Sequence, residues 1–366
     1  MKSNLILGLD IGGANTKAVL IQFKEKRIIK SYSFIEYFPF WEQSKNQFYQ
    51  LLNRILSNLT IEHNIEPKDI LSIAITITAE LSDAFETKKE GILSILNQLS
   101  KVFENDKLRF ITIENTYINY EEALENPTLL AAANWISTSL FLGEFIPNCI
   151  LIDSGSTTTD FIPIWRSKPA TIGKTDIERL INHELIYTGG LRATIPSITH
   201  FVPYKNQNIR ISFEKFALIS DVNRILNYIS EEDYLNETAD KRSKSLDNCY
   251  ARLSRIICLD IETISKEELF SIADYIHNKQ LEIIKKELIG FLYKLKKRIP
   301  DLFEPEPTFI ITGLSADFLI RKVLEKLNYN KIKYYNTITN IPNNVNSSAF
   351  AVAVALLYKH LKMVKK

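Results

Sequence analysis

Two short segments of the sequence combine a carboxylate with glycines and hydroxyl side chains, directly after an apolar run. In each segment an aspartate comes first, Asp10 or Asp153. The residues that follow are Gly12, Gly13, Asn15, Thr16 and Lys17 in the first segment, and Gly155, Ser156, Thr157 and Thr158 in the second. Glycines let backbone N–H groups approach a phosphate closely, and hydroxyls and a lysine add further donors. The sequence therefore predicts two phosphate-binding turns.

The aspartate at the head of each turn cannot bind phosphate itself, because both groups are negative. A divalent cation would neutralise carboxylate and phosphate together. We therefore expect Mg²⁺ or Mn²⁺, with Asp10 and Asp153 as its protein ligands.

Each turn lies between two runs of β-type residues, 5–9 and 18–22 for the first and 149–152 and 161–164 for the second. Each is therefore predicted to be a hairpin with a functional turn. One such turn also fits an ordinary tight turn, whereas two make phosphate binding the better interpretation. The arrangement resembles the actin, sugar-kinase and heat-shock ATPase superfamily. That resemblance implies an α/β fold of two ribonuclease-H-like domains flanking a phosphate-binding cleft, with Asp10 and Asp153 on opposite sides.

Length and composition fit this organisation. The chain has 366 residues, of which 45% are hydrophobic, enough for two cores. Its formal net charge of +2 gives no field that favours nucleic acid or a membrane surface. The three cysteines form no Cys-x-x-Cys pair, and the five histidines show no metal-ligand spacing, which argues against a disulfide framework or a zinc site. With no signal peptide or spanning segment expected, a cytoplasmic location is predicted.

Apolar periodicity predicts the elements that position the two turns. In residues 1–147 we expect a three-stranded meander over 5–35, helices near 41–63, 89–103 and 129–142, and strands at 70–78 and 109–113. In residues 148–366 we expect the second hairpin, a helix over 176–185, helices through most of 213–292, a strand at 309–313 and a helix over 346–361. These two ranges are the predicted domains, and the final helix is expected near their junction.

A closer resemblance covers nearly the whole chain. It rests on the first hairpin and on residues 38–41, 78–85, 133–135 and 153–163, followed by 176–180, 184–189, 216–222, 238–240 and 252–260. These motifs resemble the hydantoinase/oxoprolinase-related family linked to tetrahydromethanopterin-dependent one-carbon transfer. Asn15, Ala79, His183 and Ser315 depart from the family pattern, which usually has His at the first of these positions and Gly at the others.

The resemblance implies a transferase of methanofuran biosynthesis. Such an enzyme joins an aminomethyl-furanmethanol diphosphate to γ-glutamyltyramine as an aryl ether and releases pyrophosphate. Glu80 is then a candidate base for the phenol, and Asp160 is another. Candidates for substrate binding are Arg179, Glu184, Tyr187, Thr188, Arg192 and Gly313, and Arg252 and Arg255 could also clamp anionic groups.

Plainer interpretations of the same residues stay open. Glu80 or Asp83 could cap the following helix, Arg252 and Arg255 could form a surface network near Asp260, and Trp135 could be packing. An ATP-dependent kinase or ATP-coupled amidohydrolase is the alternative function, and ATP is expected only in that case. A nucleotide-gated binding module is a third possibility.

Overall fold

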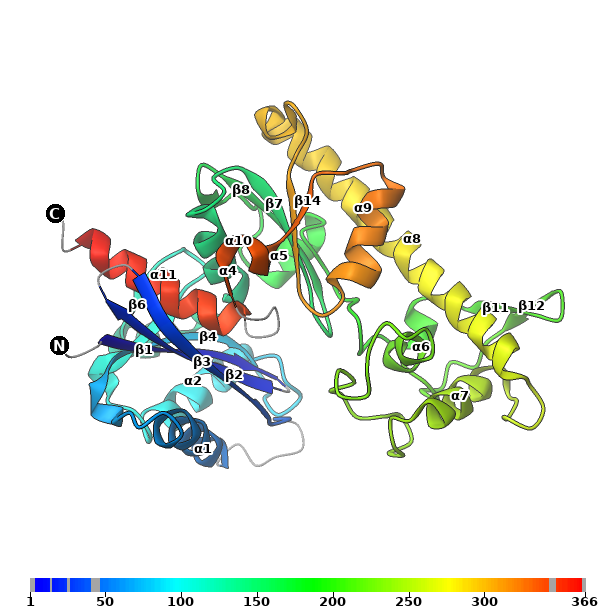
Figure 1. Ribbon diagram of the computed structural model, residues 1–366, viewed down its shortest axis with the longest axis horizontal. Helices are drawn as coiled ribbons and strands as arrows, with labels where there is room; N and C mark the ends of the chain where they lie inside the picture. The colour runs from blue at the N-terminus through cyan, green and yellow to red at the C-terminus, as the bar shows by residue number, and fades with distance from the viewer. Residues whose placement is uncertain (1–3, 14, 25–26, 41–46, 342–346, 364–366) are drawn as a thin grey trace. The chain divides into compact units, whose positions relative to one another are not determined.

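The computed structural model describes residues 4–13, 15–24, 27–40, 47–341 and 347–363 (Figure 1). Internal contacts divide the chain into two compact units. The first consists of Met1–Asn148, Ile162–Arg179 and Tyr335–Lys366, and the second of Cys149–Phe161 and Leu180–Tyr334. This division differs from the expected one, because residues 162–179 and the final helix belong with the first unit.

The first unit is built on a six-stranded sheet of order β3-β2-β1-β4-β5-β6. Its strands are β1 (Asn4–Gly12), β2 (Asn15–Lys24), β3 (Arg27–Tyr37), β4 (Ile70–Thr78), β5 (Leu108–Ile111) and β6 (Tyr117–Ile118). The first three form an antiparallel meander, and β4 lies parallel to β1. The predicted first hairpin, the meander and the strand at 70–78 are therefore confirmed.

The two faces of β1 carry different layers of helix. Leu5, Leu7 and Leu9 point into one core with α1 (Phe48–Ile61) and α2 (Lys88–Leu99). The alternate residues point to the other face, which is covered by α11 (Ser347–Met363) and α4 (Asn134–Gly143) (Figure 1). The helix expected from residue 41 starts at Phe48, while Trp41 and Ala14 lie outside the described residues. The helix expected from 129 is a 3₁₀ turn, Pro127–Leu130, followed by α4.

Gly8 allows α11 to lie directly against β1. A Cβ atom built at Gly8 would be 2.0 Å from the carbonyl oxygen of Ala349 and 3.0 Å from the Cβ of Ala353. Only a residue without a side chain fits this contact. The close approach brings the first turn of α11 to the carboxyl end of β1, where Asp10 lies.

The second unit contains the second hairpin, β7 (Cys149–Ser154) and the start of β8 (Thr159–Trp165), in a sheet of order β10-β8-β7-β13-β14. The added strands are β10 (Leu185–Ile186), β13 (Phe309–Thr312) and β14 (Ile332–Tyr334), with β9 (Lys168–Pro169) paired to β8. Its helices include α6 (Ile219–Ile225), α7 (Leu246–Ser254), the 33-residue α8 (Lys266–Arg298) and α9 (Lys322–Lys326). None of the helices described here or in the first unit is both long and apolar enough to span a bilayer.

Three differences from the predicted elements have local causes. The helix expected over 176–185 ends early as α5 (Asp176–Ile181), because His183 adopts the left-handed conformation (φ 59°) and residues 185–186 then pair with β8. The helical stretch expected over 213–292 is interrupted, with Asn227, Lys241 and Cys258 also left-handed. A hairpin of β11 (Phe201–Tyr204) and β12 (Gln207–Arg210) was not predicted.

The contact at Gly8 generates the first testable prediction. Gly8→Ala should lower the free energy of unfolding by about 1–3 kcal/mol, because the new methyl group displaces α11 from β1. Thermal and urea unfolding measure this loss. Gly155→Ala is the matched control, since a Cβ there meets no atom within 4 Å. Equal stability of Gly8→Ala and the unchanged protein would contradict the packing described here.

Candidate active site

The first predicted phosphate turn places a buried carboxylate beside a lysine and the start of α11. Asp10 is only 5% exposed, and its Oδ2 accepts a hydrogen bond from the Ser348 hydroxyl. Lys17, its cross-strand partner, has its Nζ 3.6 Å from the same oxygen. The other oxygen, Oδ1, is buried and has no hydrogen-bond partner in the described part of the chain.

An unpartnered buried carboxylate oxygen fits a cation ligand, because burial without compensation is costly. No cluster of three or more His, Cys, Asp or Glu side chains gathers anywhere in the described ranges. Mg²⁺ commonly uses one or two carboxylates together with substrate phosphates and water. The donor set at Asp10 is therefore suited to Mg²⁺ in the presence of a phosphate ligand.

Gly12 and Gly13, in the described part of the first turn, make close backbone contacts. A Cβ at Gly12 would lie 2.8 Å from the Asn15 carbonyl oxygen, and the Gly13 carbonyl accepts a hydrogen bond of 3.1 Å from the Phe40 N–H. The Thr16 hydroxyl is buried and lacks a hydrogen-bond partner among the residues described.

The second predicted phosphate turn is held by a chain of buried hydroxyl groups. The Ser154 hydroxyl lies 2.7 Å from both the Ser315 and the Thr159 hydroxyls. Thr159 in turn donates to the Thr188 carbonyl at 2.8 Å. The Gln280 amide, from α8, continues the chain with bonds of 2.8 Å to the Thr188 hydroxyl and the Gly189 carbonyl. These hydrogen bonds connect the β7–β8 hairpin to the loop that carries Ser315, to the segment at 188–189 and to α8.

Backbone contacts on either side of the turn require two glycines. Gly313 has φ 92°, and a Cβ there would be 2.3 Å from the Ser154 carbonyl oxygen and 2.8 Å from Asp153 Oδ1. A Cβ at Gly189 would be 2.6 Å from the Gly155 carbonyl oxygen. In contrast, the space next to Gly155 itself is open. The segments at Gly189 and Gly313 therefore pack tightly against the turn, whereas the space beside Gly155 stays open and could admit a phosphate.

Glu80 lies just beyond the carboxyl end of β4, in the first unit. It is only 2% exposed, and its Oε2 has no hydrogen-bond partner in the described residues. Burial raises the pKa of Glu80 from its ordinary 4.5 to about 7; the negative charge of Asp176 adds to this rise and Lys88 opposes it. A carboxyl with a pKa near neutral suits proton transfer. Helix α2 is capped by Thr87, so the interpretation that Glu80 or Asp83 caps it is wrong.

Arg179, in the last turn of α5, is buried and lies over an aromatic ring. It is 1% exposed, and its guanidinium carbon is 4.4 Å from the centroid of Trp135, which is itself 3% exposed. In the same helix, Asp176 is 4.0 Å from Lys88, the residue whose charge reaches Glu80. The expectation that Trp135 is packing is confirmed, and its ring packs against Arg179.

The remaining predicted site residues lie in the second unit, close to the second turn. The Thr158 hydroxyl donates to Asp160 at 3.4 Å, and the Arg192 N–H donates to the Ser156 carbonyl. Glu184 is buried, 4.0 Å from Arg298, whereas Tyr187 is 52% exposed. The sequence motifs at 184–192 therefore converge on the turn at 155–158.

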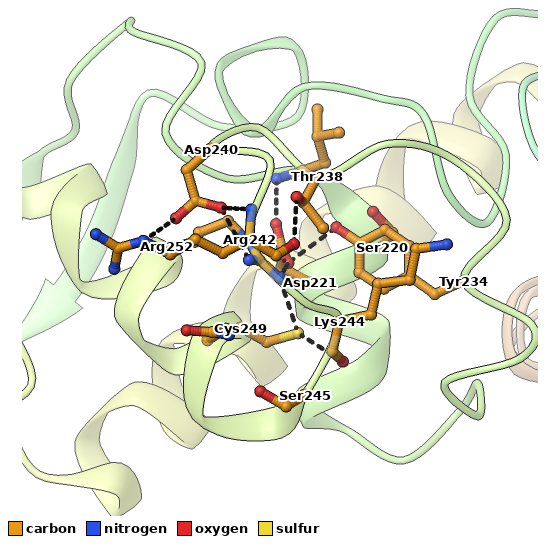
Figure 2. Close-up of polar contacts among 12 residues, drawn as sticks. Ser220, Asp221, Tyr234, Thr238, Asp240, Arg242, Lys244, Ser245, Cys249 and Arg252 are labelled. Atoms are coloured by element: carbon orange, nitrogen blue, oxygen red, sulfur yellow. Dashed lines mark hydrogen bonds and ion pairs between the residues drawn. The ribbon is translucent and has the colours of Figure 1, made fainter. Parts of the chain in front are cut away.

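Arg252 belongs to an ion-pair network that includes buried groups (Figure 2). Arg255 joins this network through Asp240. Arg252 is fully buried and binds Asp221 at 2.7 Å and Asp240 at 3.1 Å, and Arg255 binds Asp240 at 3.1 Å. Asp221 also accepts a hydrogen bond of 2.9 Å from the Tyr234 hydroxyl. The expected partner, Asp260, instead bonds within its own turn. The network joins three of the motifs noted in the sequence and holds α6 to α7.

Sequence reasoning did not identify several residues that shape the site. Ser348 binds Asp10 from the far end of the chain, and Gln280 reaches the second turn from α8. Neither stands in a glycine-rich or charged motif. Their only sequence signal is a polar residue on an otherwise apolar helix face.

Comparison with known proteins agrees with this architecture. The sequence matches the family described as Hydantoinase/oxoprolinase over residues 72–360. The chain belongs to the hydantoinase/oxoprolinase family. The expected membership is confirmed.

Two relatives carry the name (4-{4-[2-(γ-L-glutamylamino)ethyl]phenoxymethyl}furan-2-yl)methanamine synthase. The protein of Methanocaldococcus jannaschii is 35% identical over 332 residues, covering 90% of this chain and 91% of the relative. That of Methanococcus vannielii is 32% identical over 213 residues, covering 58% of this chain and 91% of the relative.

Among solved structures, nucleotide-free acetone carboxylase is similar with a TM-score of 0.54 at 11% identity. The match covers 96% of this chain and 70% of that one. The likeness shows the fold, and the predicted α/β fold class is confirmed.

The hydroxyl chain under the second turn can be tested by removing one link. Thr159→Val keeps the shape but leaves the Thr188 carbonyl and the Ser154 hydroxyl short of a partner, which should cost about 1–3 kcal/mol of unfolding free energy. Denaturant unfolding gives the value. Thr337→Val, at an exposed position of a helix in the first unit, is the control. A loss no larger than that of the control would contradict the role of the chain.

The raised pKa of Glu80 predicts a pH-dependent stability. Because the folded protein binds this proton more tightly than the unfolded chain, the contribution of Glu80 to the free energy of unfolding falls as pH rises from 4.5 to about 7. Glu80→Gln removes the titration. The variant should therefore gain up to about 3 kcal/mol relative to wild type between pH 4 and pH 8. Unfolding at both pH values measures this, with exposed Glu86→Gln as the control. If the difference in unfolding free energy between Glu80→Gln and wild type were the same at both pH values, a buried Glu80 with a raised pKa would be excluded.

Proposed function

We propose that this protein joins a phenol to a furfuryl diphosphate, forming an aryl ether and releasing pyrophosphate. The donor is an aminomethyl-furanmethanol diphosphate, and the acceptor is γ-glutamyltyramine. The product then corresponds to the compound in the relatives' name, which contains an aryl ether between a tyramine ring and a furan methylene.

The observation that carries this proposal is the 35% identity to the Methanocaldococcus jannaschii synthase over 90% of this chain. The two glycine-rich turns add support, because the reaction needs a site for a diphosphate. The first turn offers the buried Asp10 and the second a braced backbone with open space at Gly155.

The reaction requires one bond to break and one to form. The bond between the furfuryl carbon and the bridging oxygen breaks, and its electron pair leaves with pyrophosphate. The phenol oxygen supplies the electron pair of the new C–O bond and loses its proton. The electron-rich furan stabilises positive charge at the carbon, so the protein must chiefly hold the leaving group and accept the proton.

The proposed roles follow from these needs. The backbone and hydroxyls of the two turns, with Lys17, bind phosphate oxygens. Asp10 and Asp153 are the proposed protein ligands of Mg²⁺ or Mn²⁺, which would offset the charge developing on pyrophosphate. The unpartnered Oδ1 of Asp10 supports the first of these assignments.

Glu80 is the proposed base. Its pKa of about 7 leaves a substantial ionised fraction at neutral pH while keeping it basic enough to accept the phenol proton. Asp160 is the second candidate. Arg179, Arg192, Glu184, Tyr187, Thr188 and Gly313 remain candidates for holding the substrates.

The proposal is tested by pyrophosphate release. Purified protein with Mg²⁺ should release pyrophosphate from the furan diphosphate only when γ-glutamyltyramine is present, and the ether should appear in equal amount by mass spectrometry. ATP should be neither required nor hydrolysed. Hydrolysis of ATP stimulated by an amide or hydroxyl substrate, without ether formation, would instead support the ATP-dependent alternative.

Single substitutions test whether the aspartates of the two turns are needed for this activity. Asp10→Asn and Asp153→Asn should each lower kcat at least a hundredfold, since each removes charge that holds the cation. Cys258→Ser, at an exposed cysteine that belongs to neither turn, should leave kcat unchanged. Folding of each variant is checked by circular dichroism. Full activity in both aspartate variants would exclude the proposed cation site.

A further inference from the structure

A pocket of about 310 Å³ lies in the second unit, between α8 and α9. Side chains from both helices and Tyr228 line it. We call it the α8–α9 pocket. Its charged residues are Asp274 on α8 and Lys322, Glu325 and Lys326 on α9. Figure 1 shows the two helices side by side.

One of the residues that line the pocket is a buried histidine, His277, which lies close to the Phe318 backbone. His277 is 1% exposed, and neither ring nitrogen makes a hydrogen bond of normal geometry in the described structure. Burial lowers the pKa of His277 to about 3, and the charges of Lys322 and Lys326 act in the same direction. The ring is therefore neutral at physiological pH, with one nitrogen able to donate and the other to accept. Buried polar groups are rarely left in this state unless a ligand or water completes them.

Aromatic rings fix the position of one of the two lysines. Tyr228 stacks on Phe318, with ring centroids 5.3 Å apart and planes within 3°, and lies 4.8 Å from the His277 ring. Lys322 donates to the Tyr228 hydroxyl and has its Nζ 4.1 Å from the ring centroid. Lys326 donates to the Asn278 amide oxygen at 3.3 Å. Two cations are thus held at the pocket with defined directions.

The pocket is next to the second phosphate turn. Gln280, which binds Thr188 and Gly189 under the turn, follows His277 by three residues on α8, or about 4.5 Å along the helix axis. From the other side, Phe318 contacts Gly190, where an added Cβ would lie 3.1 Å from its ring. A substrate bound at the turn could therefore extend into the pocket.

We propose that the α8–α9 pocket binds the free α-amino acid end of the acceptor, the γ-glutamyl group. A γ-amide leaves both the α-carboxylate and the α-ammonium free. Lys322 and Lys326 match the carboxylate, Asp274 and Glu325 match the ammonium, and His277 supplies a neutral donor and acceptor. A zwitterion is the ligand that uses both signs of charge. This inference rests on the proposed function, because that function supplies the acceptor.

The test compares two acceptors, γ-glutamyltyramine and tyramine, which differ only in the γ-glutamyl group. For each, kcat/KM is measured by pyrophosphate release, and Kd by titration calorimetry. In Lys326→Gln and Lys322→Gln the preference for γ-glutamyltyramine over tyramine should fall about tenfold or more, through loss of a charge-assisted hydrogen bond. Lys279→Gln is the matched control, because Lys279 lies on α8 but pairs with Glu282 outside the pocket.

Each outcome decides a separate point. Wild-type turnover with an unchanged preference in both lysine variants overturns the pocket assignment and leaves the proposed function standing. Binding of γ-glutamyltyramine that weakens in the variants, with no turnover of any pair, keeps the pocket and overturns the function. Absence of both binding and turnover overturns both. If the variants instead weaken a non-hydrolysable ATP analogue and not γ-glutamyltyramine, the pocket binds a nucleotide and the assignment is wrong.

Discussion

The chain of buried hydrogen bonds from Ser315 through Ser154 and Thr159 to Thr188 is the interaction on which the second turn depends. A glycine-rich turn is intrinsically flexible, and each freely rotating residue would have to be ordered when a phosphate binds. The hydroxyl chain orders it beforehand, by tying the hairpin to the loop after β13 and, through Gln280, to α8. Because α8 also carries His277, the same helix contacts the second turn and lines the neighbouring pocket.

The first turn is supported by a different device. There a helix, α11, approaches β1 so closely that only glycine fits at position 8, and its first turn brings Ser348 to Asp10. The N-terminus of a helix carries partial positive charge, which stabilises a buried carboxylate. Lys17 adds to this stabilisation on one oxygen, while the other oxygen keeps its capacity for a ligand. Asp10 is therefore oriented through Oδ2, and its Oδ1 stays available to a ligand.

These two devices also explain what could and could not be predicted from the sequence. The hairpins were predictable because their apolar runs end in glycine-containing turns, and the strand at 70–78 was predictable because it is a run of β-type residues. The end of α5 was not, because a histidine occupies the left-handed position that usually signals itself by glycine. His183 tolerates it with a ring hydrogen bond of 2.7 Å to Glu287. Likewise, Ser315 departs from the glycine that the family resemblance led us to expect, and its hydroxyl is part of the hydrogen-bonded chain under the turn.

Long-range partners were the largest omission. The pKa of Glu80 responds to the charges of Lys88 in α2 and Asp176 in α5, which lie far apart in the sequence, and the link from Gln280 to Thr188 spans 92 positions. The local sequence pattern does not indicate which distant residues will contact one another in the fold. Arg252 illustrates the converse case. Its motif was visible, but only the fold shows that its charge is used internally, on Asp221 and Asp240, and is not presented to a ligand.

The central claim is that the two turns serve a leaving group at carbon and not a phosphoryl donor. The most direct measurement labels the oxygen that bridges the furfuryl carbon and the diphosphate with ¹⁸O and follows it by mass spectrometry. The account predicts that all the label leaves in pyrophosphate and that the ether contains only the phenol oxygen. Label retained on the furan product, or a phosphorylated phenol, would show cleavage at phosphorus and contradict the account.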